Sequence, residues 1–431
     1  MKLFGRNFAR TAFHTLAPAV FLAAPLVGQT VLTWPEVLQR FEADNPALKA
    51  AKEEVDESKA NEVTAYLRPN PDMSAAVDQI NPLSNQPPPY GSGGYSYRPL
   101  EYAFPSLAFN YLHERQHKRE LRRDSARETT AITESQFADQ ERGLVFALRT
   151  AFVQVLQAKA VLDNARENLN YWDQELKVNR DRYKAGDMAM VDLNRLELER
   201  VQFETDLQTA LVNLRTSKIQ LLTLLNQRIP LEQFDVRGDY GFREELNPLD
   251  DYRSTALAKR PDLMAAIQGV ELANINHRLA DANGSTDPTF GLDFGRAPPI
   301  PAYMGVNVSI PLRVFDRNQG EKERTRIDIG RNEQLLDAAR AQVFSDVDSA
   351  YWTLVQAIEL LKPYKSKYLP MSQDIRDRMA FSYKNGGASL LDFLDAEKSY
   401  RDTRLAYLNL IGSYLATAAQ MNMAVGAEVI P

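Results

Sequence analysis

Two aspartates three residues apart carry the clearest chemical pattern in the sequence. Asp392 and Asp395 lie in LLDFLDAEKSY, a strongly helical segment, so their carboxylates project from one helix face. Neighbouring carboxylates attract cations and resist ionising together. A second role is open for Asp392, because Ser389-x-x-Asp392 is a capping box, in which side chains satisfy free N–H groups at a helix start. Asp395 lies too far into the helix for capping.

The sequence offers little that is typical of an enzyme. His113 and His117 are four residues apart, so they could bind a metal together on a helix face. No HExxH motif or third ligand accompanies them, which favours solvated residues near a membrane surface over a metal site. Phosphate-binding loops, nucleophile elbows and dinucleotide fingerprints are absent from the sequence. We therefore expect no enzyme, and no catalytic, cofactor-binding or metal-binding residues.

Composition excludes several other classes. The 431 residues are 44% hydrophobic, which is enough for a core, and the net charge is −6. An acidic chain is a poor nucleic-acid binder, so we expect no nucleic-acid partner. The chain contains no cysteine, which excludes a disulfide framework, a thiolate metal site and lipid attachment through cysteine.

The N-terminus has the layout of a secretory signal. Lys2, Arg6 and Arg10 precede the apolar stretch TAFHTLAPAVFLAAPLVG, and we expect a signal peptide over residues 1–28. Its removal would change the net charge from −6 to −9. A disordered tail or a buried helix is the alternative. No segment after residue 30 reads as apolar over the roughly 18 residues of a spanning helix, so membrane entry would require a β-barrel.

Long helices dominate the rest of the chain. Between Pro105 and Pro230 there is no proline, and the only glycines are Gly143 and Gly186. As one helix, residues 113–183 would be on the order of 100 Å long at ~1.5 Å per residue. Leucines with coiled-coil spacing follow Gly186, namely Leu207, Leu211, Leu214, Leu221 and Leu225. Because glycine reaches positive φ cheaply, we predict that the helix folds back at Gly186.

The tip of this hairpin recurs later in the chain. RYKAGDMAMVDLNRLELER, residues 182–200, aligns without a gap with SYKNGGASLLDFLDAEKSY, residues 382–400. The matched pairs are Tyr183 and Tyr383, Gly186 and Gly386, and Asp192 and Asp392. NPAL at Asn45 likewise resembles RPDL at Arg260, and we interpret these matches as an internal duplication.

The duplication predicts the domain organisation. The first structural repeat covers residues 29–230 and contains a helix, two strands and a long helical hairpin. An inter-repeat equatorial segment covers residues 231–250, the second repeat covers 251–426, and 427–431 form a C-terminal tail. Helices of the second repeat extend from Arg317 to Val425, interrupted by Pro363 and Pro370.

Each repeat also contains two candidate strands. AYMGVNVSIP and TFGLDFG alternate apolar with small or polar residues and are joined by RAPPIP, which predicts a hairpin. In the first repeat, SYRPLEYAF and the weaker DMSAAVD are the candidates. Four strands are too few to close a barrel alone. The apolar face fits lipid and the terminal tyrosines fit a membrane interface, although a soluble sheet packed on the helices would explain the strands as well.

The tips YKAGDMAMVDL and YKNGGASLLDFLDAEKSY, with RPNPDMS before the first strand and SIPLRVFDRNQG after the last, resemble the TolC-like outer membrane factors, the outer membrane efflux protein family. The resemblance covers nearly the whole mature chain, and RPNPDMS resembles the heavy-metal-efflux branch. It implies a mainly α fold with a small membrane β-barrel: a long coiled-coil barrel, plus four strands per chain that complete a twelve-stranded barrel in a trimer. Such proteins are passive exit ducts of tripartite efflux or secretion systems in the Gram-negative outer membrane.

The resemblance also implies partners and site residues. A homotrimer embedded in outer membrane lipid would meet a periplasmic adaptor (membrane fusion) protein and an inner-membrane pump of the resistance-nodulation-division or ABC type. The expected tip and adaptor-contact residues are Tyr183, Gly186, Asp187, Tyr383, Gly386, Gly387 and Ser389. Asp192, Asp392 and Asp395 would lie at the pore entrance, where threefold symmetry gathers carboxylates into a cation-attracting ring. Asp192 resembles a residue that holds the entrance shut, but Ala388 stands where the family can offer a partner arginine.

A soluble periplasmic adaptor or scaffold without a pore is the competing hypothesis. Adaptors also carry helical hairpins, but usually one per chain among β-rich domains. This chain has two predicted hairpins, with amphipathic strands placed between helices, which favours the duct.

Overall fold

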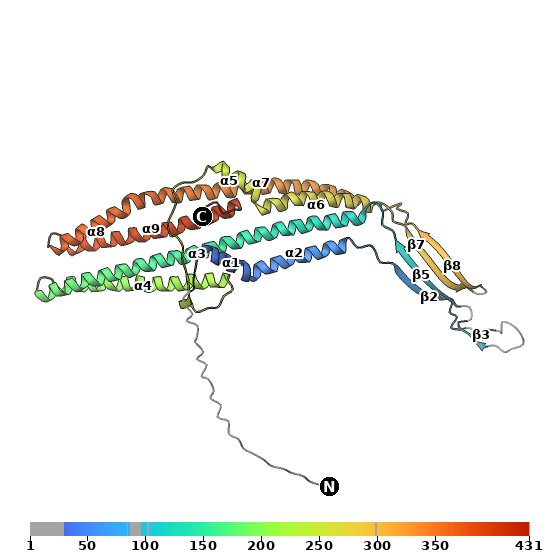
Figure 1. The fold of residues 1–431 in the computed structure, drawn as a ribbon, viewed down its shortest axis with the longest axis horizontal. Coiled ribbons are helices and arrows are strands. Elements are labelled where there is room, and N and C mark those ends of the chain that lie inside the picture. The colour runs from blue at the N-terminus through green and yellow to red at the C-terminus, as the bar shows by residue number, and fades with distance from the viewer. Residues whose placement is uncertain (1–29, 84, 87–95, 101–102, 298–299, 431) are drawn as a thin grey trace, which may run out of the picture.

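The structure is a computed structural model that describes residues 30–83, 85–86, 96–100, 103–297 and 300–430. The expected signal peptide lies outside these residues. The molecule is elongated, with paired helices along most of its length and a small sheet at one end (Figure 1). Both helical hairpins have their tips at the opposite end.

The first hairpin consists of α3 (Lys118–Ala185) and α4 (Met190–Leu224). Gly186 ends α3 with φ of 85°, and the N–H of Asp187 donates to the carbonyl of Arg182 at 2.9 Å, so the predicted glycine stop is confirmed. Helix α3 begins later than expected because residues before it form a strand and because Gln116 and His117 have positive φ. His113 and His117 therefore do not share a helix face, and the interpretation of a helical metal-binding pair is wrong.

The second hairpin consists of α7 (Gln319–Pro363), η2 (Tyr364–Tyr368), α8 (Leu369–Lys384) and α9 (Leu390–Val425). Pro363 has no N–H to donate, and the π-helical turn η2 follows it directly. At the tip, Gly386 has φ of 76°, and α9 then begins with Ser389 as its N-cap. The expected helical region, its interruption and its tip are confirmed.

Four antiparallel strands form the sheet, in the order β2 (Asp72–Asp78), β5 (Phe104–Leu112), β7 (Thr289–Ala297) and β8 (Ile300–Ser309). The predicted β7–β8 hairpin and strand β2 are confirmed. The strand expected over 96–104 is wrong: β3 (Asn85–Gln86) pairs with the short β4 (Ser96–Tyr97), and the long strand begins at Phe104. Strand β5 includes Pro105, which lies opposite Val77 of β2.

One face of this sheet is apolar and uncovered. Its register places Leu292 opposite Phe109 on one side and Val306 on the other, and these side chains are 45%, 40% and 72% exposed. The opposite face carries Asn110, Gly291 and Asn307 in one row. The sheet extends beyond the helix ends in Figure 1. The alternative of a soluble sheet packed on helices therefore does not describe the folded chain.

A belt of shorter elements surrounds the middle of the hairpins (Figure 1). It contains α1 (Trp34–Asp44), α5 (Leu249–Lys259) and the parallel pair β1 (Thr30–Leu32) and β6 (Phe234–Val236), the latter preceded by the turn η1 (Leu231–Gln233). Helices α2 (Pro46–Ala65) and α6 (Pro261–Asn283) continue from this belt toward the sheet. The two largest hydrophobic clusters of the chain lie here.

Helix α3 contains an 18-residue window that is apolar enough, by length and composition, to cross a membrane. The expectation that no such segment follows residue 30 is therefore wrong. Leu148, Phe152 and Val155 of this helix are nevertheless buried in the core of the belt, against α1, α4 and β6. We interpret the window as a core segment, since packing against neighbouring elements explains its composition.

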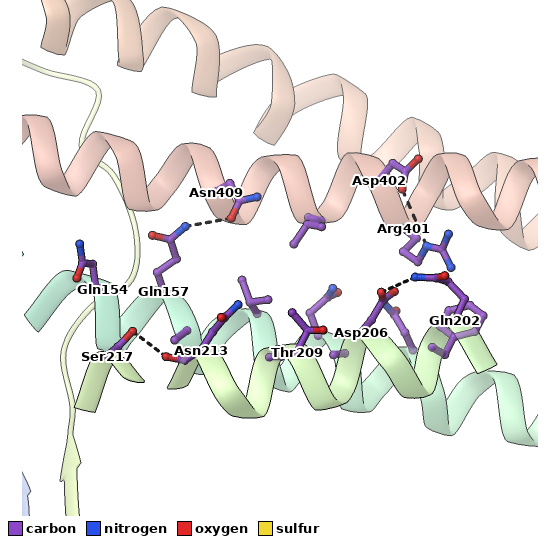
Figure 2. A pocket seen from close by; sticks show the side chains of 18 residues that line it. Gln154, Gln157, Gln202, Asp206, Thr209, Asn213, Ser217, Arg401, Asp402 and Asn409 are labelled. Carbon is purple, nitrogen blue, oxygen red and sulfur yellow. Dashed lines mark hydrogen bonds and ion pairs between the residues drawn. The ribbon is translucent and has the colours of Figure 1, made fainter. Parts of the chain in front are cut away.

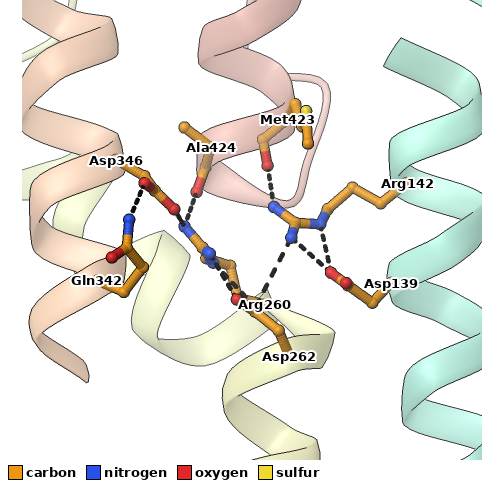
Figure 3. Close-up of polar contacts among 8 residues, drawn as sticks. All are labelled: Asp139, Arg142, Arg260, Asp262, Gln342, Asp346, Met423 and Ala424. Carbon is orange, nitrogen blue, oxygen red and sulfur yellow. Dashed lines mark hydrogen bonds and ion pairs between the residues drawn. The ribbon is translucent and has the colours of Figure 1, made fainter. Parts of the chain in front are cut away.

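Two arginines attach the end of α9 to the belt (Figure 3). Arg260, between α5 and α6, is 3% exposed and binds Asp262 at 2.9 Å, Asp346 at 2.8 Å and the carbonyl of Ala424 at 3.2 Å. Arg142 of α3 donates to the carbonyl of Met423. Both arginines thus satisfy carbonyls of the last turn of α9, where a cation is favourable.

Candidate functional site

The predicted tip residues differ in their accessibility. Tyr183 is 39% exposed, and Asp187, Gly387 and Ser389 are also exposed. Tyr383 is buried, because its ring stacks on Phe393 with centroids 5.2 Å apart. Tyr183 and Tyr383 are therefore equivalent in sequence but not in environment. The exposed residues can meet another protein directly, whereas Tyr383 lies beneath the tip surface.

Aromatic rings join the two hairpins just above the tips. Trp172 of α3 stacks on Phe203 of α4 at 5.0 Å and on Phe393 of α9 at 6.0 Å. With Tyr383 of α8, the stack includes one ring from each of four helices, and all four rings are buried. Sequence reasoning missed this stack because nothing in a single sequence shows which distant aromatic residues will meet.

Asp392 forms the predicted capping box. Its carboxylate accepts hydrogen bonds from the Ser389 hydroxyl at 2.7 Å and the Ser389 N–H at 3.1 Å. In return, the N–H of Asp392 donates to the Ser389 hydroxyl at 3.2 Å. The hydrogen bonds from the Ser389 side chain and backbone lower the pKa of Asp392. The capping role is confirmed, and the pore role of Asp392 remains a prediction.

The other two entrance aspartates lie near the tips, Asp192 half-buried and Asp395 exposed. Asp192 lies 3.7 Å from Arg195 on its own helix, and this exposed pair is weak. Asp395 is exposed and has no ion pair or hydrogen bond within the described part of the chain. Ala388, where the family can offer an arginine, packs at the edge of the aromatic cluster. The structure thus brings all three aspartates to one end of the molecule.

A pair of buried glutamates was missed by sequence reasoning. Glu397 of α9 is 3% exposed and Glu175 of α3 is 6% exposed. Lys384 donates to Glu175 at 2.7 Å, but Oε2 of each glutamate has no hydrogen-bond partner among the described residues. Burial raises the pKa of Glu397 to about 7, although the positive charges of Arg376 and Arg401 oppose this shift.

A polar groove lies along the same helices (Figure 2). It has a volume of about 530 Å³ and lies between α4 and α9, with α3 as its floor. Asp206, Thr209 and Asn213 line one wall, and Asp402 and Asn409 line the other. The groove contains many side-chain amides, of which Gln157 of the floor donates to Asn409 at 3.0 Å.

The architecture defines a class before any comparison. Two long hairpins with adjacent tips, and a sheet with an uncovered apolar face at the far end, are typical of a membrane-anchored tunnel protein. Residues 252–427 match the family described as "Outer membrane efflux protein". In this match and in its fold, the chain is similar to the TolC-like outer membrane factors.

Curated relatives and solved structures agree with this assignment. The chain is 22% identical to the cobalt-zinc-cadmium resistance protein CzcC of Cupriavidus metallidurans, over 92% of this chain and 90% of that protein. It is 21% identical to the outer membrane protein TolC of Vibrio cholerae, over 94% of both chains. Its fold resembles that of CusC with a TM-score of 0.75 and 17% identity, over 98% of this chain and 99% of the other.

Proposed function

We infer that the chain is the outer membrane channel of a tripartite efflux system, a passive duct from the periplasm to the exterior. The observation that carries this conclusion is the uncovered apolar face of the four-stranded sheet, at the end opposite the hairpin tips. Apolar side chains are stable against lipid, whereas their exposure to water is unfavourable. The soluble adaptor or scaffold, our second hypothesis, would leave this face exposed to water.

We propose a homotrimer, in which three four-stranded sheets close one twelve-stranded barrel and the hairpins form the periplasmic tunnel. The open sheet supports this proposal, because β2 and β8 each lack a hydrogen-bonded neighbour on the outer side within the described strands. A single chain therefore presents two edges that another copy can pair.

We propose the internal duplication and the domain division given above on similar grounds. Asn45 of NPAL donates to the carbonyl of Leu224, at the end of α4, at 2.9 Å. Arg260 of RPDL donates to the carbonyl of Ala424, at the end of α9, at 3.2 Å. The two motifs thus hold corresponding helix ends in the two halves, which supports residues 29–230 and 251–426 as repeats separated by residues 231–250.

At the tips, we propose contact with a periplasmic adaptor through the exposed residues Tyr183, Asp187, Gly387 and Ser389, with the two stop glycines shaping the surface. Asp192, Asp392 and Asp395 would lie at the pore entrance. The adaptor would connect the duct to an inner-membrane pump of the resistance-nodulation-division or ABC type. The duct itself would carry out no catalysis.

For the cargo, we propose divalent metal cations. The name of the relative CzcC refers to resistance to cobalt, zinc and cadmium. Acidic side chains at the tips and along the groove of this chain supply a surface that attracts cations.

The test is the native mass of the protein extracted by detergent from fractionated outer membranes. We expect a heat-sensitive trimer that conducts ions in planar lipid bilayers. A monomer or dimer recovered from the soluble periplasm would overturn the duct and support the scaffold.

A further inference from the structure

Asp206 of α4 and Asp402 of α9 line opposite walls of the polar groove, and each belongs to a series of carboxylates spaced by seven residues. On α4 they are Asp192, Glu199 and Asp206, and on α9 they are Asp395 and Asp402. Seven residues make nearly two helical turns, so each series stays on one side of its helix. Asp206 and Asp402 therefore lie on the same sides of α4 and α9 as the entrance aspartates Asp192 and Asp395.

Within the described residues, Asp192 and Glu199 have a close basic partner, whereas Asp206 and Asp395 have none. Asp192 lies beside Arg195, and Glu199 accepts a hydrogen bond from Arg401 at 3.2 Å. Asp206 accepts only from the neutral amide of Gln202, at 2.8 Å. Asp402 lies 4.0 Å from the guanidinium of Arg401. Arg401 also donates to Glu199, and it is the one basic residue of the lining beside Asp206 and Asp402. The lining of the groove therefore has a net negative charge.

The floor of the groove adds an unpartnered oxygen. Asn164 of α3 lines the groove and is 5% exposed, and its Oδ1 has no hydrogen-bond partner among the described residues. A buried amide oxygen without a partner is costly unless a ligand or water donates to it. Carboxylate and amide oxygens together are the groups that hard divalent cations and their bound waters prefer.

The size of the groove determines the form of the cation. A volume of about 530 Å³ is far larger than a bare ion, and the described residues contain no cluster of three or more carboxylates or histidines that could hold one. We propose that the groove binds hydrated divalent cations, whose water ligands donate hydrogen bonds to Asp206, Asp402 and Asn164. The site would hold the cargo above the entrance, so this inference rests on the proposed function.

The test uses the full-length trimer in planar lipid bilayers. The probes are Mg²⁺ and hexaamminecobalt(III), an inert complex that can bind only through its outer hydrogens. We expect the D206N/D402N variant to raise the half-blocking concentration of Mg²⁺ roughly sixfold, the effect of removing two charges about 7 Å from a divalent ion in salt solution. The rise should be larger for hexaamminecobalt(III), because its charge is +3. The reversal potential of the variant in a KCl gradient should also move toward lower cation selectivity.

Two comparisons separate this site from the rest of the duct. Asp163 of α3 does not line the groove and pairs with Arg166 at 3.4 Å, so D163N should change neither measurement. In a D392N/D395N background, D206N/D402N should still weaken the block. Unchanged block and selectivity in D206N/D402N, or an equal change in D163N, would overturn the site.

Equilibrium dialysis of Mg²⁺ against the detergent-solubilised protein tests the site without requiring a pore. We expect D206N/D402N to lose bound Mg²⁺ and D163N to retain it. A chain that binds Mg²⁺ in this way but conducts no ions would refute the proposed duct and leave the site standing. A conducting chain whose Mg²⁺ binding is the same in both variants would refute the site alone.

Discussion

The hydroxyl of Tyr383 on α8 donates a hydrogen bond of 3.1 Å to the side-chain oxygen of Asn179 on α3, across 204 residues of sequence. Both residues are buried, so this bond joins the two hairpins beneath the tips. Tyr383→Phe removes the donor and leaves the Asn179 oxygen unsatisfied, at a cost of about 1–3 kcal/mol. We expect faster amide hydrogen exchange in residues 376–396 of the variant.

The control for this prediction is Tyr183→Phe. Tyr183 has the equivalent place in the first tip, but its ring is 39% exposed and its hydroxyl makes no hydrogen bond among the described residues. Amide hydrogen exchange in the Tyr183→Phe variant should therefore equal that of the native protein. Equal exchange in native protein and Tyr383→Phe would show that the bond does not hold the hairpins together.

Glu397 should make stability depend on pH in an unusual direction. Burial raises its pKa from 4.5 to about 7, so the folded state binds its proton more tightly than the unfolded state. The stabilisation is complete below about pH 4.5 and is lost as the pH rises through about 7. The loss is roughly 3 kcal/mol for this shift.

The variant Glu397→Gln removes this dependence, because glutamine stays neutral. Its thermal midpoint should be close to that of the native protein at pH 5 and higher at pH 8. The charged and titratable groups around Glu397 are Tyr171, Glu175, Arg376, Asp377 and Arg401. Glu333→Gln, at an exposed position on α7, is the control and should show no such crossover. Identical midpoint differences at both pH values would contradict the prediction for Glu397.

Arg260 should be more important for stability than other arginines of the belt. Its guanidinium is buried against Asp262 and Asp346, and Arg260→Met leaves these carboxylates without their cation. Because the guanidinium is buried but the two carboxylates left behind are about one-third exposed, we expect a loss of about 1–3 kcal/mol, that of hydrogen bonds to a charged group. We expect a corresponding fall in the midpoint of denaturant-induced unfolding of the detergent-solubilised protein.

Arg253 provides a matched control on the neighbouring helix α5. It binds Asp348 through two hydrogen bonds of 2.8 and 2.6 Å, but both side chains are 33% exposed. Since exposed pairs contribute about 0–1 kcal/mol, Arg253→Met should have a small effect. Similar losses in both variants would mean that burial does not determine the importance of Arg260.

The entrance aspartates give a prediction about conduction. Replacing Asp392 and Asp395 with alanine should leave the trimer intact and weaken block of the channel by divalent cations, because the ring loses its charge. Conductance in planar bilayers with increasing Mg²⁺ measures this. Ala388→Ser, a neutral change at the same tip, should leave the block as it is. Undiminished block in the double alanine variant would exclude the carboxylate ring.

Sequence patterns predicted the elements whose signals are local. Gly186 and Gly386 marked both tips because positive φ is a property of single residues, and the alternation over 289–310 marked a hairpin. The strand expected over 96–104 was misplaced because the pairing of residues 104–112 with β2 and β7 depends on residues distant in sequence. The burial of Glu397 was not predictable, because the side chains that cover it come from helices distant in sequence.

The capping box illustrates the same limit at the candidate site. Spacing alone identified the bonds between Ser389 and Asp392, since both residues lie within one turn. The orphan oxygen of Asn164 gives no signal in sequence, because asparagine in a helix is common on solvated faces. Only the packing of α3 against α4 and α9 shows that it is enclosed.

Strands β2 and β8, which have no outer neighbour among the described strands, have a consequence for how mutations would be inherited. If three copies must share one barrel, a chain with normal helices and a defective edge strand would still enter the assembly. One such copy would leave the ring open for its two intact neighbours. With equal expression of both forms and random mixing, only about one assembly in eight would contain three intact chains. Edge-strand variants should therefore be dominant over the native gene, whereas variants that cannot fold at all should be recessive.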